Sequence, residues 1–223
     1  MARIDALTKS GSTASARAQG RGPSLLVVHP GGSGEASWDA VTRELVSEFE
    51  VVRIRRRIYL PDADLTGHSM AVEVGDILAI AAVLEPPILL VGQGSGAVAA
   101  FEAALSIPWE FAGLVAYEPL MPTPSQPDAL VVSGAQTPAQ LADSAAIDEL
   151  GTGIDRYSGL ALSITLVEGE LSPASLRERV SDLVAVLPNA RVVTLPGQDH
   201  EAHLLAPAQL AAAIRTVAGQ LLR

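Results

Sequence analysis

Residues 89–97 read Leu89-Leu90-Val91-Gly92-Gln93-Gly94-Ser95-Gly96-Ala97. The apolar run before Gly92 predicts a buried β-strand, and the Ala-rich run over Ser95–Ser106 predicts a helix. Between the two, glycine stands at every second position, which is typical of a sharp turn in which backbone segments pack closely. The stretch therefore predicts a strand, a tight turn and a helix in direct succession.

The same alternation continues on both sides of this unit. Short runs of Val, Ile and Leu alternate with longer amphipathic runs, which predicts βαβ units and an α/β fold with a doubly wound, mostly parallel sheet. The expected strands are Ser24–His29, Glu50–Arg55, Pro87–Gly92, Gly113–Tyr117, Ser163–Val167 and Arg191–Leu195. The expected helices are Trp38–Phe49, Met70–Leu84, Ser95–Ser106, Ala174–Leu187 and Pro207–Leu222.

Two segments interrupt the alternation. Residues 1–23 lack a strong apolar period, and we expect a disordered N-terminal arm before a single domain over residues 24–223. Residues 121–162 are rich in Pro, Ser, Gly and Thr around one helical stretch, Pro138–Leu150. An excursion of this kind between two late strands predicts a reduced lid.

Composition limits the partners of the chain. Its 223 residues carry a formal net charge of −10, and the one dense basic cluster, Arg53 with Arg55, Arg56 and Arg57, lies at a strand exit. We expect these arginines to be solvated or ion-paired and nucleic acid to be no partner. No run approaches the roughly 18 apolar residues of a membrane span, and no signal-peptide pattern precedes the domain, so we expect a cytoplasmic protein without membrane contact.

Three segments resemble the α/β-hydrolase superfamily. Gly92 to Gly96 resembles its nucleophile elbow, G-x-S-x-G, a strained turn between a strand and a helix. Residues 114–119, Leu-Val-Ala-Tyr-Glu-Pro, are similar to the L-x-x-Y-E-P-P stretch of one subgroup, and residues 187–200 are similar to its P-N-A-R-V-V-x-L-P-G-Q-x-H motif. The resemblance covers roughly residues 24–222 and implies an α/β-hydrolase fold with a small-molecule substrate.

The resemblance places glycine where the family has its nucleophile. With Gly92 and Gly96 as the flanking small residues, Gly94 falls on the serine position, and the Ser95 N–H becomes a candidate oxyanion donor. A register one residue later would make Ser95 the nucleophile, but it would put Gln93 on a position that needs a small residue. Gly31 and Gly32, which follow the first expected strand, are further oxyanion candidates.

The other catalytic groups are also implied by the resemblance. The family's catalytic histidine maps onto His200, and its acid follows either of two strands, which here gives Glu118 or Glu170, with Glu170 preferred. His203, one turn beyond His200, is expected to be structural. A second elbow-like stretch, Gly67-His68-Ser69-Met70-Ala71, follows no strand, so we expect Ser69 to be a helix N-cap. No nucleotide-binding, Walker or zinc motif occurs, and we expect neither a cofactor nor a metal.

Three functions are compatible with these residues. The first is an enzyme that uses His200 as general acid or base with oxyanion stabilisation but forms no acyl-serine; hydrolysis by water, a lyase reaction or an isomerisation would suit it. The second is a serine hydrolase that uses Ser95 in a distorted elbow. The third is a ligand-binding protein that has kept the pocket without the chemistry. The sequence indicates neither the oligomeric state nor the identity of the substrate.

Overall fold

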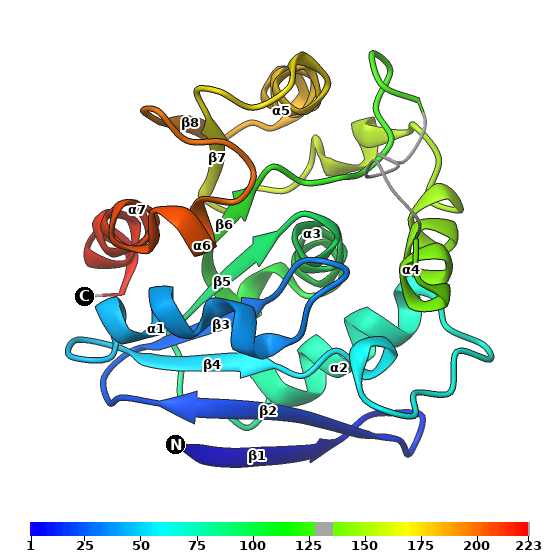
Figure 1. Ribbon diagram of the computed structural model, residues 1–223, viewed down its shortest axis with the longest axis vertical. Coiled ribbons are helices and arrows are strands. Elements are labelled where there is room, and N and C mark those ends of the chain that lie inside the picture. The colour runs from blue at the N-terminus through cyan, green and yellow to red at the C-terminus, as the bar shows by residue number, and fades with distance from the viewer. Residues whose placement is uncertain (128–135, 223) are drawn as a thin grey trace.

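A computed structural model describes residues 1–127 and 136–222, which form one eight-stranded sheet covered by helices (Figure 1). The strands are β1 (Ala2–Leu7), β2 (Thr13–Gln19), β3 (Ser24–Val28), β4 (Glu50–Ile54), β5 (Ile88–Gln93), β6 (Phe111–Tyr117), β7 (Ile164–Gly169) and β8 (Ala190–Leu195). Their order across the sheet is β1-β2-β4-β3-β5-β6-β7-β8. β1 and β2 are antiparallel to their neighbours, and the other pairs are parallel.

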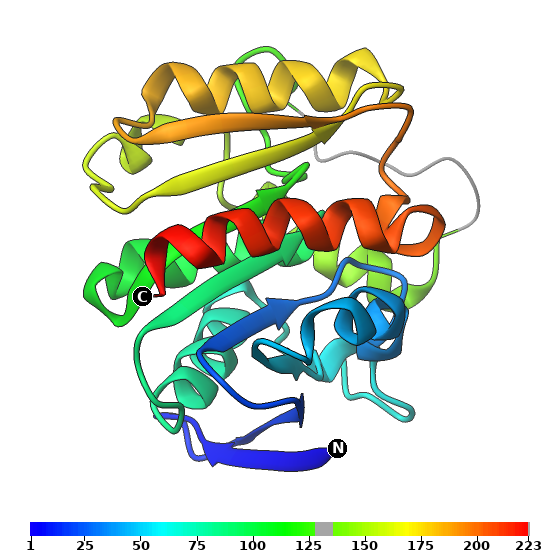
Figure 2. The same ribbon diagram turned by 90° about the vertical axis from the view of Figure 1, so that its left-hand side faces the viewer.

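Helices cover both faces of the sheet. They are α1 (Asp39–Leu45), α2 (Met70–Ala81), α3 (Ser95–Ser106), α4 (Pro138–Asp148), α5 (Ala174–Val186), α6 (Ala202–Leu205) and α7 (Pro207–Leu221), with short 3₁₀ turns η1 (Glu35–Trp38), η2 (Arg57–Tyr59), η3 (Pro108–Glu110) and η4 (Ile154–Tyr157). Successive residues of a strand point to opposite faces. In β3, accordingly, Leu25 packs in one apolar cluster with α1 and α7, and Leu26 packs in the other with α2, α3 and α5. Figure 2 faces the side that α1 and α7 cover.

The expected fold class is confirmed. All six predicted strands and all five predicted helices are present, with their ends shifted by a few residues. The chain passes from β3 to β4 on one side and then returns to β5 on the other, so β3 and β5 are neighbours at the point where the winding reverses. In open α/β sheets, ligands bind at the carboxyl ends of the strands at such a point.

The expectation of a disordered N-terminal arm is wrong. Residues 2–7 and 13–19 form the hairpin β1–β2, and β2 pairs with β4, with Ala16 opposite Ile54 and Ala18 opposite Val52. The domain therefore includes these residues. Alanines at positions 14, 16 and 18 are buried under α2. Because alanine has a low β propensity, its alternation gave a weaker strand signal than a run of Val or Ile would have given.

Residues 121–162 carry α4 and η4 among their described parts, and residues 128–135 of this predicted lid lie outside them. α4 starts at a capping box, in which the Thr137 side chain accepts from the Gln140 N–H and the Gln140 side chain accepts from the Thr137 N–H. Figure 1 shows α4 at the carboxyl end of the strands. None of the described helices is long and apolar enough to cross a bilayer.

Candidate active site

The turn between β5 and α3 has the backbone of a strained elbow. Gly94 has φ 58° and ψ −124°, a backbone conformation that residues other than glycine rarely adopt. Its N–H donates to the Tyr117 carbonyl at 2.9 Å, and its own carbonyl accepts from Ala97 at 3.1 Å. Gly94, and not Ser95, therefore occupies the sharp turn at the end of the strand.

The three glycines of the elbow differ in what surrounds them. A Cβ atom on Gly92 would lie 2.6 Å from the Ala97 Cα, and one on Gly96 would lie 2.3 Å from the His29 carbonyl oxygen. Backbone packing therefore excludes any side chain at both positions. A Cβ atom on Gly94 would instead meet the His200 Nε2 and the Pro30 Cβ at 3.4 Å each. A small side chain would fit there, beside the imidazole, at a cost in backbone strain only.

His200 is paired with a buried carboxylate. Its Nδ1 lies 2.7 Å from the Glu118 Oε2, and the other oxygen of Glu118 accepts from the Gly169 N–H at 2.7 Å. Glu118 is fully buried at the end of β6, in a conformation with φ 43°, and its N–H bonds to the Val167 carbonyl. Both carboxylate oxygens are thus held, and the imidazole presents Nε2 toward the elbow.

The preference for Glu170 over Glu118 is wrong. Glu170 lies on the surface after β7, where its side chain accepts from the Gly197 N–H at 2.7 Å. β6 lies between β5 and β7, so a residue at its carboxyl end is next to the elbow, whereas the residue after β7 is one strand farther away. The hydrogen bond to His200, which a single sequence does not show, decides between the two acids.

Among the described residues, the Ser95 hydroxyl makes no hydrogen bond with His200. Its hydroxyl donates to the Asp143 Oδ2 at 2.7 Å and accepts from the Arg56 guanidinium at 2.9 Å, and the residue is 4% exposed. A hydroxyl that donates to a carboxylate on the far side from the imidazole cannot pass its proton to His200. The geometry contradicts the reading in which Ser95 is the nucleophile.

Ser95 belongs to a buried polar cluster that we call the Arg56 network: Arg56, Glu73, Asp143, Ser95 and Tyr59. Arg56 donates to the Glu73 Oε2 at 2.9 Å and to the Asp143 Oδ1 at 2.6 Å, and the Tyr59 hydroxyl donates to Asp143 at 2.6 Å. Burial alone would raise the pKa of Asp143, but the charge of Arg56 and hydrogen bonds hold that pKa well below its usual range. Arg56 is ion-paired as expected, but it is buried rather than solvated.

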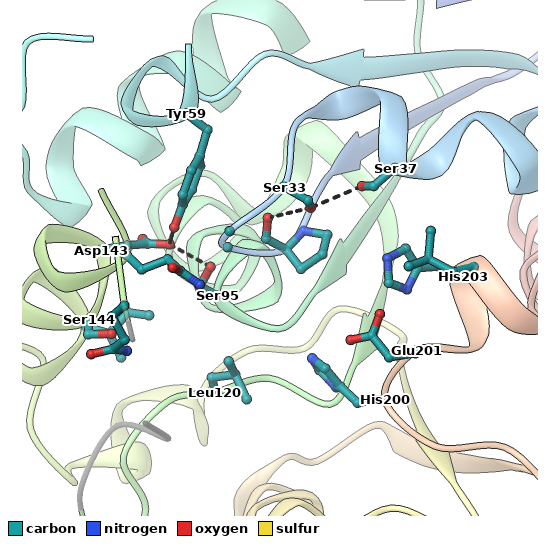
Figure 3. Close-up of a pocket in the computed structure, with 17 residues that line it drawn as sticks. Ser33, Ser37, Tyr59, Ser95, Leu120, Asp143, Ser144, His200, Glu201 and His203 are labelled. Carbon is teal, nitrogen blue, oxygen red and sulfur yellow. Dashed lines mark hydrogen bonds between the residues drawn. The ribbon is translucent and has the colours of Figure 1, made fainter. Parts of the chain in front are cut away.

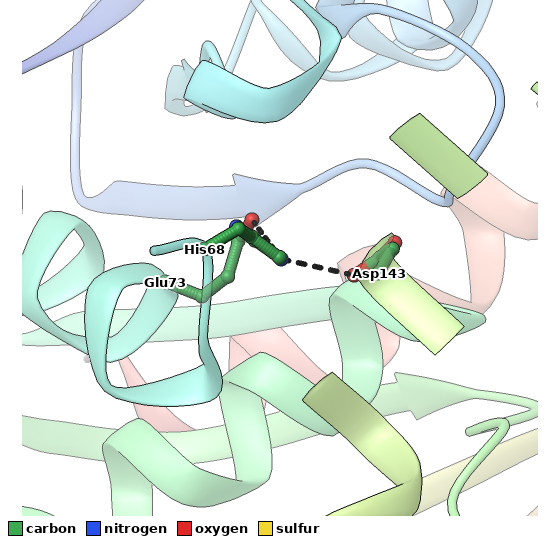
Figure 4. A group of neighbouring side chains, drawn as sticks. All are labelled: His68, Glu73 and Asp143. Atoms are coloured by element: carbon green, nitrogen blue, oxygen red, sulfur yellow. Dashed lines mark ion pairs between the residues drawn. The ribbon is translucent and has the colours of Figure 1, made fainter. Parts of the chain in front are cut away.

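His68 forms a second cluster with Glu73 and Asp143 of this network, and no sequence pattern predicted it. The His68 Nε2 is buried and lies 3.9 Å from the Glu73 Oε1 and 3.9 Å from the Asp143 Oδ1, a spacing that could hold a metal ion (Figure 4). Both carboxylates, however, already receive hydrogen bonds from Arg56. A second cation would sit beside the guanidinium charge, so these residues fit an ion-pair network that ties α2 to α4 better than a metal centre.

A cavity of about 290 Å³ opens over the elbow between His200 and α4. Figure 3 shows Tyr59, Asp143 and Ser95 at one end of it and His200, Glu201 and His203 at the other. Gly31 and Gly32 line it as well, so all three predicted oxyanion residues share this cavity with His200. Ser95 begins α3, and the first N–H groups of a helix have no helical acceptor. Among the described residues that line the cavity, none is Lys or Arg.

Comparisons with known proteins place the fold. No protein-family model matches the chain, and no curated protein does. An α/β hydrolase from Sphaerobacter thermophilus is 21% identical over 95% of this chain and 98% of its own, with a TM-score of 0.77. A thermophilic esterase from Thermogutta terrifontis is 18% identical over the whole of both chains, with a TM-score of 0.83. An epoxide hydrolase from Vigna radiata is 14% identical over 98% of each chain, with a TM-score of 0.76.

The chain therefore has the α/β-hydrolase fold. At these identities the likeness establishes the fold alone, and the chemistry has to be argued from the residues of the site.

Proposed function

We propose that this protein is an enzyme that acts on a small ester or carbonyl compound by general acid and base catalysis at His200, without an acyl-enzyme on serine. The observation that carries this proposal is the pairing of His200 with the buried Glu118 beside an elbow that has no side chain. A buried carboxylate held by a backbone N–H and aimed at one imidazole nitrogen serves to orient that ring. In a protein that only bound ligands, this arrangement would have no evident use.

The roles follow from the proton positions. The Glu118 carboxylate accepts a hydrogen bond from Nδ1–H, which leaves a lone pair on Nε2 facing the space over Gly94. A water molecule in that space gives a proton to Nε2 as its oxygen attacks the carbonyl carbon of an ester. The same proton then passes from Nε2 to the leaving alkoxide as the carbon–oxygen bond breaks. A positioned base of this kind contributes roughly 10²–10⁴-fold to a rate.

The negatively charged oxygen of the tetrahedral intermediate needs hydrogen-bond donors that stabilise it. The Ser95 N–H at the start of α3 and the Gly31 N–H supply backbone donors that cost no reorganisation during reaction. The Gly32 N–H, the third candidate, already bonds to the Tyr59 side chain. Each donor of this type is worth roughly 10²–10³-fold in rate. Gly94 provides the room for the attacking oxygen that a serine side chain would otherwise fill.

A direct test compares the two acids that the sequence left open. Glu118→Gln places an amide where one atom must accept from the Gly169 N–H, so its NH₂ group faces His200 and forces the proton of the ring onto Nε2. We expect the kcat/KM for hydrolysis of 4-nitrophenyl acetate to fall about 10²–10⁴-fold in this variant and in His200→Ala. The matched control, Glu170→Gln, changes only a surface contact and keeps the wild-type rate.

The outcome separates the remaining hypotheses. If His200→Ala turns over the ester at the wild-type rate, His200 is not the catalytic base. The hypothesis of a protein that only binds ligands would then be favoured. A fluorophosphonate probe reports on an activated serine. We expect it to leave the wild type unmodified, because the Ser95 hydroxyl is committed to Asp143.

A further inference from the structure

A chain of three side chains behind the elbow fixes the proton of a second histidine. We call Trp38, Gln93 and His203 the relay. The Trp38 indole N–H lies 3.1 Å from the Gln93 Oε1, and an indole nitrogen only donates, so the amide atom that faces it must be the oxygen. The Gln93 Nε2 lies 2.8 Å from the His200 carbonyl, which only accepts. Two independent partners therefore impose the same amide orientation.

The orientation of Gln93 determines the tautomer of His203. The same NH₂ group lies 2.9 Å from the His203 Nδ1. An amide NH₂ has two protons, one for the His200 carbonyl and one for this nitrogen, so Nδ1 accepts. In a neutral imidazole the other nitrogen then carries the proton. His203 thus carries its proton on Nε2. Because Nδ1 already accepts from Gln93, the one further hydrogen bond that the ring can make is one that Nε2–H donates.

The surroundings of His203 keep it neutral. The residue is 2% exposed, its ring stacks on Trp38, and burial together with the nearby His200 lowers its pKa to about 4. It lines the same cavity as His200, on the same side as Glu201 (Figure 3). No protein acceptor for the Nε2–H is found among the described residues, and Nε2 is not sealed from solvent, so this donor is open to the cavity that His203 lines.

We propose that the Nε2–H of His203 is a binding subsite for an uncharged oxygen acceptor of the substrate, such as a second carbonyl, an ether or a nitro group. This subsite rests on the proposed function in one respect, because it places the reacting carbonyl of the same molecule at His200. The charges of the cavity exclude a carboxylate as the preferred acceptor. The charge of Asp143 is balanced by Arg56, but Glu201 lies in the wall on the side of His203, and no Lys or Arg is found among the described lining residues.

The tautomer is measurable without any substrate. In nitrogen-15 spectra of the imidazole rings we expect His203 to be protonated at Nε2 over the pH range of about 5 to 8, with the signal assigned by its loss in His203→Gln. Gln93→Glu replaces the NH₂ donor by a carboxylate, which accepts from both the Trp38 N–H and a His203 Nδ1–H and so inverts the tautomer. An Nδ1–H tautomer in the folded wild type would overturn the proposal.

Binding is tested with 4-nitrophenylacetone, a ketone that cannot be hydrolysed and that carries a carbonyl and a nitro acceptor. We expect it to bind the wild type at millimolar or lower concentration, to shift the His203 nitrogen signals, and to bind His203→Phe and Gln93→Glu about tenfold more weakly. His203→Gln, which offers an amide donor, should recover part of the affinity. Circular dichroism of each variant checks that it is folded.

Two controls make the result specific. The first control is 2-(4-nitrophenyl)acetate, the carboxylate anion of the same shape as the ketone. The wild type should bind this anion more weakly than the ketone, and Glu201→Gln should bind the anion more tightly than the wild type does. Equal ketone affinity for wild type and a folded His203→Phe, tighter binding of the anion by the wild type, or no ketone binding at millimolar concentration would each refute the subsite. Because the ketone is not turned over, this outcome is independent of whether His200 catalyses hydrolysis.

Discussion

At the scale of single residues, Gly94 is the distinctive position of this site, because it leaves the sharp turn between β5 and α3 without a side chain. The elbow keeps every feature that packing demands: Gly92 and Gly96 admit no Cβ atom, and the backbone of Gly94 has positive φ although a Cβ atom would find ordinary contacts there. The strained turn, the imidazole and its acid are thus all present. Under the proposed function, the site lacks only the hydroxymethyl group of a serine at position 94.

Adding that group should therefore change the chemistry of the site. In Gly94→Ser the new Cβ atom lies 3.4 Å from the His200 Nε2, so a hydroxyl on it can reach hydrogen-bond distance of the ring. We expect this variant to be labelled stoichiometrically by a fluorophosphonate and to release 4-nitrophenol from 4-nitrophenyl acetate in a burst. Labelling is measured by intact-protein mass spectrometry.

The controls for this variant separate strain from chemistry. A side chain at positive φ costs roughly 1–3 kcal/mol, and Gly94→Ala carries the same cost without the hydroxyl. Gly94→Ala and Gly94→Ser should therefore be destabilised equally, and only the serine variant should be labelled. The double variant Gly94→Ser with His200→Ala should lose labelling. A folded Gly94→Ser protein that resists the probe would show that His200 is not placed to activate a hydroxyl.

At the scale of elements, one buried carboxylate ties α4 to the rest of the site. Asp143 comes from α4, and its partners come from other parts of the chain: Arg56 directly before η2, Tyr59 in η2 and Ser95 at the start of α3. α4 also lines the cavity through Gln140 and Ser144. The Arg56 network is therefore a polar connection that holds this helix against the elbow, in addition to the apolar packing of Ile147.

Removing the charge of Asp143 should loosen α4 and destabilise the fold. Asp143→Asn leaves the guanidinium of Arg56 buried with one carboxylate partner, and breaking a buried pair costs about 3–5 kcal/mol. Because the pKa of Asp143 is lowered in the folded state, its contribution is present above the unfolded pKa of about 3.9 and is lost as the pH falls further. Urea unfolding should thus show a gap between wild type and variant that narrows below about pH 4.

The matched control is Glu149→Ala, which removes an exposed carboxylate at the end of the same helix. Its effect on the urea midpoint should stay within about 0.5 kcal/mol. A gap between wild type and Asp143→Asn that persisted unchanged to pH 3, or an equal loss in Glu149→Ala, would contradict the role assigned to the Arg56 network.

The elements differ in how far the sequence predicted them. The strands that flank the elbow and the helix after it were predictable, because apolar runs and glycine spacing are local signals. The β1–β2 hairpin was missed, since its alanines become strand residues through pairing with β4. His200 followed from a local motif, whereas the choice of its acid depended on which carboxylate packs against the imidazole in three dimensions. The Arg56 network joins residues far apart in sequence, and no local pattern predicts it.

At the scale of the whole molecule, we expect two buried histidines to make the fold sensitive to mild acid. His29, at the end of β3, is 1% exposed, and burial with the nearby charge of Arg56 lowers its pKa to about 3. The pKa of His203 is lowered to about 4 by burial and by His200. In the unfolded chain both rings have a pKa near 6.5. Between these values the unfolded state binds more protons than the folded state.

The sign of the effect follows from this difference. Stability is highest above about pH 6.5 and falls as the pH is lowered toward 4, by about 1.4 kcal/mol per pH unit for each histidine that is fully protected from protonation. The formal charge of −10 at pH 7 acts in the opposite direction, since acid reduces repulsion, but carboxylates titrate mostly near pH 4 and change little above pH 5. We therefore expect the free energy of unfolding in urea to decrease steadily from about pH 7 to pH 5. His203→Gln, which cannot be protonated there, should show a shallower decrease than the wild type. A wild-type free energy of unfolding that is constant over this range would mean that His29 and His203 accept protons in the folded state. His203 would then be a charged imidazolium below about pH 6.5, and it would not be the neutral Nε2–H donor that the relay imposes.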